Sequence, residues 1–288
     1  MKSTGLIEID GFKLKYLTEG NGPDVLVIGS SVYYPRSFSQ NLRKFFRLHF
    51  VDYRGFAEGP EVELTFEDLL DDLEHIRQKL GLKKCIVIGH SAHGLLALEY
   101  AKKHQEHVSH VVMIGMPPHM KSDHVAMAQR NWDESVWPER KAAFERNMRL
   151  MPDEELNSLP RDQWFLEMNF RNVPKSWYDY NFDSTTLWKG VKPNTHVLDQ
   201  MYLRFAREID VSQGLESLDL PVLLAYGRFE FLVAPAHSWD PLRPKFKDLT
   251  VRIFEKSAHS PQYEQPDLFD AELLKWLREN YTATVQKE

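Results

Sequence analysis

Three residues far apart in the chain have the types and the order that nucleophilic catalysis needs. Ser91 lies in the hexapeptide GHSAHG, directly behind the apolar run at residues 85–88. Glu230 and His259 come later, each in a loop behind a further apolar run. A serine hydroxyl is a weak nucleophile at neutral pH, so it needs a base, and the base needs an orienting carboxylate. The pattern therefore predicts acyl transfer to water, with Ser91 as nucleophile, His259 as base and Glu230 as orienting acid.

The surroundings of Ser91 are those of a nucleophile elbow, a tight turn between a strand and a helix. Such a turn strains the backbone of the nucleophile and needs small residues two positions away on either side. Gly89 meets this requirement, whereas His93 is bulky. The N-terminus of the following helix would favour the negative charge that develops during the reaction. The alternative is a strand-end serine that only caps a helix; we favour the elbow because Glu230 and His259 follow in the required order.

The elements that would position these residues follow from hydrophobic patterning. Runs such as CIVI and VVMI are apolar on both sides, which is typical of a parallel sheet covered by helices on both faces. A helix is expected to start at Thr65, which forms a capping box with Asp68, and to stop at Gly81. Further helices are expected over 95–103 and from residue 266. The predicted strands are 6–9, 13–17, 25–28, 48–51, 85–88, 111–114, 222–226 and 249–254.

The pattern changes in the middle of the chain. From 117 to 215 there is no convincing core strand, and the sequence is helical and aromatic. Five of the seven tryptophans of the chain lie there: Trp132, Trp137, Trp164, Trp177 and Trp188. We therefore predict one α/β core, residues 1–116 and 216–288, interrupted by a helical cap over 117–215. The tryptophans could form the core of the cap itself, but we expect one or two to face substrate, with Trp164 and Trp137 as candidates.

Composition narrows the function classes. The 288 residues carry 36 Lys and Arg against 42 Asp and Glu, a net charge of −6, which argues against nucleic acid as a partner. No apolar run is long enough for a membrane span, and the N-terminus lacks the apolar core of a signal peptide. The single cysteine, Cys85, cannot form an internal disulfide, which favours a cytoplasmic protein. Histidine spacing and glycine content predict neither a metal site nor a cofactor, so the expected partner is a small-molecule substrate.

In three further segments the chain resembles the α/β-hydrolase superfamily. The segment VDYRGFAEG is similar to the D-x-R-G-x-G loop of that family, and DLPVLLAYGRFEFLVAP to its acid segment, with Glu230 where Asp is usual. The segment SAHSPQYEQPDLF is similar to its G-H-x-x-x-x-E-x-P-x-x-F histidine segment at His259. The resemblance covers nearly the whole chain. It implies an α/β-hydrolase fold with an inserted helical cap and a Ser91–Glu230–His259 triad, closest in layout to prolyl aminopeptidases and to cap-bearing esterases and lactonases.

The resemblance also implies an oxyanion hole. One donor would be the backbone N–H of Ala92, and the other, by alignment of the loop behind the third strand, that of Ser31. Hydroxyls of Ser30 or Tyr33 could hydrogen-bond to substrate. His93 stands where the family usually has glycine, and it either packs against the core or lines the floor of the pocket.

The predicted reaction is hydrolysis of an ester, lactone or thioester of a small, largely apolar acyl compound. Epoxide hydrolases and dehalogenases of this fold use an aspartate nucleophile, so serine at position 91 disfavours those reactions. A prolyl-type aminopeptidase, whose cap carboxylates would hold the free amine of the substrate, is the second hypothesis. A non-hydrolytic ligand receptor or lyase of the same fold is the third.

Overall fold

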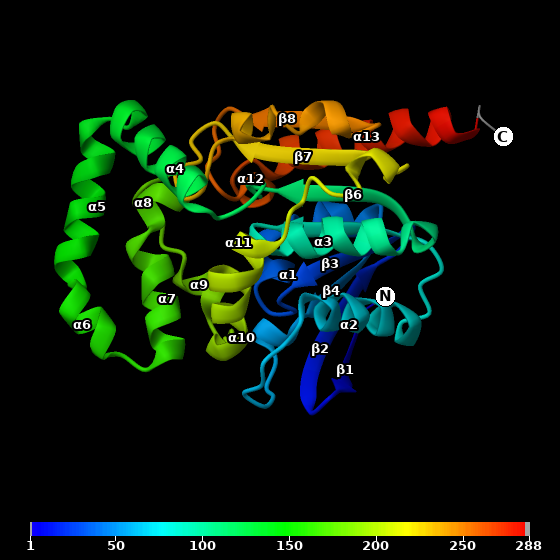
Figure 1. Cartoon of the computed structure of the whole chain (residues 1–288), viewed down its shortest axis with the longest axis horizontal. Helices are drawn as coiled ribbons and strands as arrows, with labels where there is room; N and C mark the ends of the chain where they lie inside the picture. The colour runs from blue at the N-terminus through cyan, green and yellow to red at the C-terminus, as the bar shows by residue number, and fades with distance from the viewer. Residues whose placement is uncertain (1, 286–288) are drawn as a thin grey trace.

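The protein has one central β-sheet. The computed structural model describes the backbone of residues 2–285 and the side chains of residues 2–280. The sheet lies entirely within these residues. This sheet has eight strands in the order β1-β2-β4-β3-β5-β6-β7-β8 (Figure 1). β1 and β2 pair antiparallel, as do β2 and β4, and the other neighbours are parallel. The prediction of a mostly parallel sheet is confirmed. The strands are β1 (Lys2–Ile9), β2 (Phe12–Gly20), β3 (Asp24–Gly29), β4 (Arg47–Asp52), β5 (Cys85–His90), β6 (Val108–Ile114), β7 (Val222–Gly227) and β8 (Leu249–Phe254).

Helices cover both faces of this sheet. Figure 1 shows α3 in front of the strands and α13 behind them. The capping box forms as predicted, with the Thr65 side chain accepting from the Asp68 N–H and the Asp68 carboxylate accepting from the Thr65 N–H. α3 begins at Ala92, three residues earlier than expected, because the helix starts directly at the turn behind β5. The helices of the core are α1 (Tyr34–Ser37), α2 (Phe66–Lys79), α3 (Ala92–Lys103), α12 (Pro261–Glu264) and α13 (Pro266–Val285).

A group of helices lies between β6 and β7 in the chain. Figure 1 shows most of these helices beside the end of the sheet at which β6 and β7 terminate, and within the described residues no strand interrupts them. They are α4 (Ser122–Ser135), α5 (Pro138–Leu150), α6 (Asp153–Ser158), α7 (Arg161–Arg171), α8 (Val173–Ser176), α9 (Thr185–Trp188), α10 (Thr195–Asp199), a π-helical stretch (Gln200–Phe205) and α11 (Ala206–Glu208). We refer to this inserted group as the cap; its limits at 117 and 215 stay a prediction.

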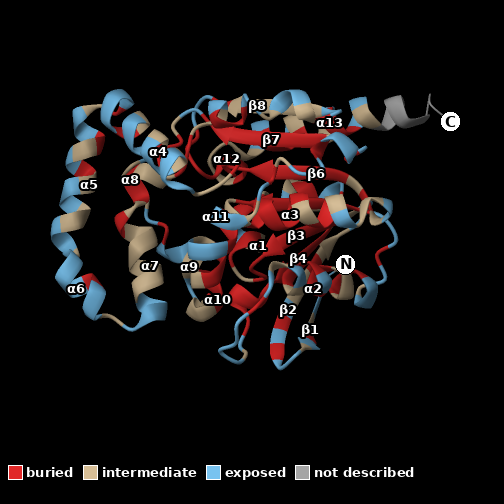
Figure 2. Ribbon diagram, viewed as in Figure 1, coloured by how far each residue is buried: buried red, intermediate tan, exposed pale blue. Residues whose placement is uncertain are grey.

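The core sits around the central strands. All six residues of β5 and all six of β7 are buried, and Figure 2 shows these strands as a continuous buried layer while the outer cap helices are largely exposed. Burial of apolar surface on both faces explains the unbroken apolar runs of the sequence. Cys85 is buried there, and burial raises the pKa of its thiol to about 12. Among the described helices, none combines the length and apolarity that a bilayer span requires.

The topology decides which loops meet. β3, β5, β6, β7 and β8 are parallel, so the loops behind their carboxyl ends gather at one edge of the sheet. Ligand sites of open α/β sheets form at this edge. The loops behind β3, β5, β7 and β8 carry the residues that the sequence marks for chemistry.

Candidate active site

Ser91 occupies a strained turn between β5 and α3. Its φ of 57° and ψ of −132° lie in a region that residues other than glycine rarely adopt. The Ser91 N–H donates to the carbonyl of Ile114 at 2.8 Å, which ties the turn to β6. A side chain at Gly89 would bring its Cβ within 2.1 Å of the His93 carbonyl oxygen. The glycine is therefore required by the close approach of the two arms of the turn, as an elbow demands.

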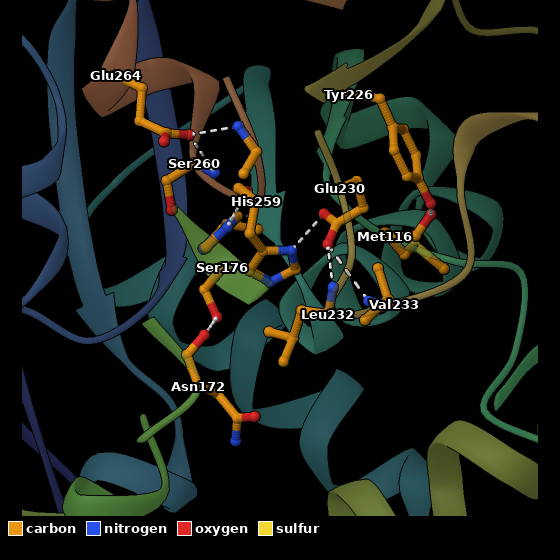
Figure 3. A network of polar contacts seen from close by, with 12 residues as sticks. Met116, Asn172, Ser176, Tyr226, Glu230, Leu232, Val233, His259, Ser260 and Glu264 are labelled. Atoms are coloured by element: carbon orange, nitrogen blue, oxygen red, sulfur yellow. Dashed lines mark hydrogen bonds and ion pairs between the residues drawn. The ribbon is translucent and has the colours of Figure 1, made fainter. Parts of the chain in front are cut away.

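Glu230 and His259 form a buried pair. Nδ1 of His259 lies 2.6 Å from Oε2 of Glu230, and the two side chains are 7% and 1% exposed (Figure 3). The other carboxylate oxygen accepts the N–H groups of Leu232 at 2.9 Å and Val233 at 3.3 Å. A carboxylate in this position holds the proton of His259 on Nδ1 and leaves Nε2 as the basic nitrogen.

Ser91 and His259 line one cavity of about 590 Å³ between the core and the cap. The loop behind β3 lines it as well, so the predicted nucleophile, base and oxyanion loop surround one cavity, and Glu230 lies behind His259. Most of the wall is apolar. The apolar residues that line the cavity include Phe56, Leu95, Met116, Met120, Trp164, Phe165, Met168, Trp177, Trp188, Leu198, Leu203, Leu232 and Val233.

Ser31, the predicted second oxyanion donor, already has a partner for its N–H. Its N–H donates to the Asp52 carboxylate at 2.6 Å, and Ser31 does not line the cavity. Ser31 stays a prediction that this hydrogen bond does not favour, and the sequence does not reveal that Asp52 takes this N–H. Within residues 30–34, the N–H groups at 32, 33 and 34 are also bound, and among the described hydrogen bonds only that of Ser30 has no acceptor.

Ser30 is thus the better candidate beside Ala92. Ser30 is 2% exposed and lines the cavity, and its hydroxyl oxygen accepts the N–H groups of Val32 at 3.2 Å and Tyr33 at 3.1 Å, which shapes the loop. Ala92 also lines the cavity, and its N–H belongs to the first turn of α3, where helical N–H groups have no partner within the helix. Two such donors can bind a developing oxyanion.

His93 is buried beside the loop behind β3. Its Nδ1 lies 2.8 Å from the Tyr34 hydroxyl and 3.1 Å from the His90 carbonyl oxygen. Room for the ring comes from Gly29, where a Cβ would lie 3.0 Å from Nδ1 of His93. Gly94 takes the close contact on the other side, since a Cβ there would lie 2.8 Å from Cβ of Met116. Histidine is therefore tolerated at this position because it packs toward the loop behind β3.

A chain of hydrogen bonds joins three segments at this edge of the sheet, those behind β3, β5 and β8. Nε2 of His90 lies 2.8 Å from the His259 carbonyl oxygen, so Nε2 carries the proton and Nδ1 of His90 accepts from the Tyr34 hydroxyl at 3.3 Å. His93 then donates from Nδ1 to Tyr34 and to the carbonyl of His90. Burial lowers the pKa of His93 to about 4 and that of His90 well below its usual value. Both rings are neutral in this chain, which fixes their tautomers.

The substrate-binding predictions have mixed outcomes. Ser30, Tyr33, His93 and Trp164 line the cavity. Trp137 does not, because its ring stacks on the Arg140 guanidinium at 4.5 Å, inside the cap; its contact with substrate stays a prediction. Trp177 and Trp188, which the sequence offers equally, line the cavity instead. The aromatic pattern identifies the cap, but helix orientation decides which ring faces inward.

Among the described residues, one group of side chains could hold a metal ion. His119, Asp123 and His124 have ligand atoms within 4.8 Å of one another at the start of the cap, and His119 lines the cavity. The Asp123 side chain is 68% exposed, and Nδ1 of His124 lies 3.3 Å from its carboxylate. No step of the chemistry considered below uses this group.

Comparisons with known proteins agree with this geometry. A family model described as alpha/beta hydrolase fold matches residues 23–266. The AB hydrolase superfamily protein YclE of Bacillus subtilis (strain 168) is 36% identical over 282 residues, 96% of this chain and 99% of that protein. The pimeloyl-[acyl-carrier protein] methyl ester esterase of Vibrio vulnificus (strain CMCP6) is 25% identical over 269 residues, 91% of this chain and 97% of that protein. A solved proline iminopeptidase from Mycobacterium smegmatis has the same fold, with a TM-score of 0.72 at 15% identity over 98% of this chain and 100% of that one.

The fold and the strained serine turn therefore define a class, that of hydrolases built on a parallel α/β sheet. The chain belongs to the α/β-hydrolase fold family. The predictions of fold, superfamily and hydrolase class are confirmed.

Proposed function

We propose that this protein hydrolyses esters of largely apolar acyl compounds through an acyl-enzyme on Ser91. Nε2 of His259 takes the hydroxyl proton as Oγ of Ser91 attacks the acyl carbon, and the carbonyl oxygen takes up the electron pair. The N–H groups of Ala92 and Ser30 stabilise this oxyanion. Collapse of the intermediate breaks the bond to the leaving alcohol, which receives the proton from His259. Water then attacks the acyl-enzyme with His259 again as base, releasing the acid and restoring Ser91.

The residues that line the cavity are the main support for an apolar ester as the substrate. Its wall is mainly aliphatic and aromatic, which suits an apolar acyl group. Among the described residues that line it, Asp199 is the one carboxylate, and Arg161 pairs with it at 2.5 Å. An aminopeptidase would need an unpaired acidic group there to hold a free ammonium. The site therefore favours an ester over an amino-terminal amide.

The relatives support the same choice. A curated relative of 25% identity is named as a methyl ester esterase and matches 91% of this chain. The proline iminopeptidase neighbour shares the fold at 15% identity, so peptide hydrolysis remains the second hypothesis, with lactones and thioesters as chemical variants of the first.

A panel of substrates and one probe test the proposal. A fluorophosphonate should label the wild-type chain at Ser91 and leave the folded S91A variant unlabelled. p-Nitrophenyl butyrate should be turned over faster than proline 4-nitroanilide, with an acyl lactone and an acyl thioester assayed beside them. Faster turnover of the anilide would reverse the ranking, and absence of labelling in folded wild-type protein would contradict hydrolysis by Ser91.

A further inference from the structure

Arg140 is a buried cation in the cap. Its side chain is fully buried, yet the nearest groups are backbone carbonyls and aromatic rings. Nη1 donates to the carbonyls of Pro174 at 2.8 Å and Trp177 at 2.6 Å, and Nη2 donates to that of Tyr178 at 2.5 Å. A buried charge is costly unless many hydrogen bonds compensate it. Arg140 therefore fixes the conformation of residues 174–178, which we call the strap.

The strap contacts the loops of both partners of Ser91. The Ser176 carbonyl accepts the N–H of His259 at 2.9 Å, and the Lys175 carbonyl accepts the N–H of Phe231 at 3.3 Å. Phe231 directly follows Glu230, and its ring lies 5.6 Å from the Arg140 guanidinium. A shift of the strap would therefore move the backbone of the acid loop and of the histidine loop together.

Glu264 holds the strap from the other side. Oε1 accepts the N–H of Tyr178 at 2.5 Å, while Oε2 accepts those of Ala258 at 2.8 Å and Ser260 at 3.2 Å. Figure 3 shows the Glu264 carboxylate beside Ser260 in the histidine loop. Ala258 and Ser260 are the two neighbours of His259. The Glu264 carboxylate thus accepts hydrogen bonds from the residues on both sides of His259 and from Tyr178 of the cap, so it links the histidine loop to the cap.

Glu264 and Arg140 bind the strap from opposite sides, and each is a buried ionisable group. The Glu264 carboxylate raises the pKa of Arg140, although burial lowers it overall to about 10. Burial raises the pKa of Glu264 to about 7, against the effect of its three N–H donors. Neither side chain is part of the cavity lining, so neither contacts substrate.

From this arrangement we propose that Glu264 and Arg140 are positioning residues that clamp the strap against the histidine loop and so set the placement of His259. The proposal rests on the proposed function, in which His259 is the base. Misplacing a catalytic group by about 1 Å can lower the rate by about a hundredfold while substrate still binds. The clamp should therefore affect kcat more than KM.

The first test is E264Q, which keeps the shape but turns an amide N–H₂ toward a backbone N–H. With p-nitrophenyl butyrate, kcat should fall by about 10- to 100-fold and KM should change by less than about threefold. E264D, which keeps the charge, should recover part of kcat. R140M should lower kcat in the same way. Matched controls are E255Q, an exposed glutamate close to the histidine loop, and R146M, an exposed arginine on the same helix as Arg140; both should stay within about twofold of wild type.

Amide hydrogen exchange provides a readout that does not need turnover. In E264Q, exchange should be faster in peptides covering 174–180 and 256–262, while a peptide from α2 keeps its wild-type rate. A wild-type chain that neither labels nor hydrolyses the ester would contradict the proposed function, and exchange alone would then decide the clamp. The clamp proposal would be overturned if both peptides of E264Q exchanged at the wild-type rate. It would also be overturned if folded E264Q had a kcat within twofold of wild type. If E264Q fails to fold, R140M and E264D decide by the same criteria.

Discussion

The hydroxyl of Tyr34 lies 2.8 Å from Nδ1 of His93 and 3.3 Å from Nδ1 of His90. Tyr34 begins α1 behind β3, whereas His90 ends β5 and His93 lies in the first turn of α3, on either side of Ser91. One hydroxyl therefore bridges the loop that offers the Ser30 N–H and the turn that strains Ser91.

Removing the Tyr34 hydroxyl should lower both the stability of the protein and its kcat, because two buried hydrogen bonds are lost. Y34F leaves Nδ1 of His90 without a donor in a buried environment, which should cost about 1–3 kcal/mol of unfolding free energy. It should also lower kcat for p-nitrophenyl butyrate by several-fold. Urea denaturation and steady-state kinetics measure the two effects. Y16F, which removes a hydroxyl from β2, outside the cavity lining, should leave both unchanged; equal behaviour of the two variants would count against the bridge.

Replacing His93 by the family's usual glycine should destabilise this chain. The ring fills the space beside Gly29, so H93G leaves a cavity, removes the hydrogen bond to Tyr34 and places glycine in a helix. We expect a loss of about 2–5 kcal/mol in unfolding free energy. Thermal or urea denaturation checks this value. A variant as stable as wild type would show that the ring is not needed for packing.

Glu230 should be required for the tautomer of His259. E230Q turns an amide group toward Nδ1 and favours the proton on Nε2, where the base is needed. By analogy with other triads, kcat should fall on the order of 10⁴-fold. The E255Q variant serves again as the control, because Glu255 is exposed and pairs only with Arg228. A loss below tenfold would mean that Glu230 does not orient the base.

Asp52 should give the stability of the protein a defined pH dependence. Burial raises its pKa from 3.8 to about 6, although the carboxylate accepts the N–H of Ser31. An acid whose pKa is raised by folding stabilises the folded state while protonated, so its contribution is lost as pH rises from about 4 to about 6.

The D52N variant cannot lose this contribution. The unfolding free energy of D52N relative to wild type should therefore increase by up to about 3 kcal/mol between pH 4 and pH 7. Urea denaturation of both proteins at several pH values measures the difference. A difference that stays constant with pH, or one of opposite sign, would contradict the assignment to Asp52.

Much of the arrangement could be predicted from local patterns. The apolar runs, the capping box of Thr65 and the order of Ser91, Glu230 and His259 all follow from residue types at short range. The predicted strands match β1–β8, and the turn at Ser91 is strained as its motif requires. Such features depend on a few neighbouring residues, so they can be predicted without knowing which distant segments meet.

Other features depend on contacts between distant segments. Ser31 and Asp52 are 21 residues apart, and their hydrogen bond decides which N–H of the loop stays available. Glu264 looks like the start of a helix in the sequence, but its carboxylate binds a cap residue 86 positions away. The same holds for Trp137 and Trp177, which differ in whether they face the cavity.

The fold class, the Ser–Glu–His order and an aromatic helical insertion follow from the amino-acid sequence alone, because hydrophobic periodicity and motif spacing are local properties of the chain. The packing of His93, the hydrogen bond that occupies the Ser31 N–H and the contact of the cap with the histidine loop could be read from the folded chain alone. Each of these depends on which backbone N–H or carbonyl is already satisfied. That competition for hydrogen-bond partners is settled only when segments far apart in sequence pack together.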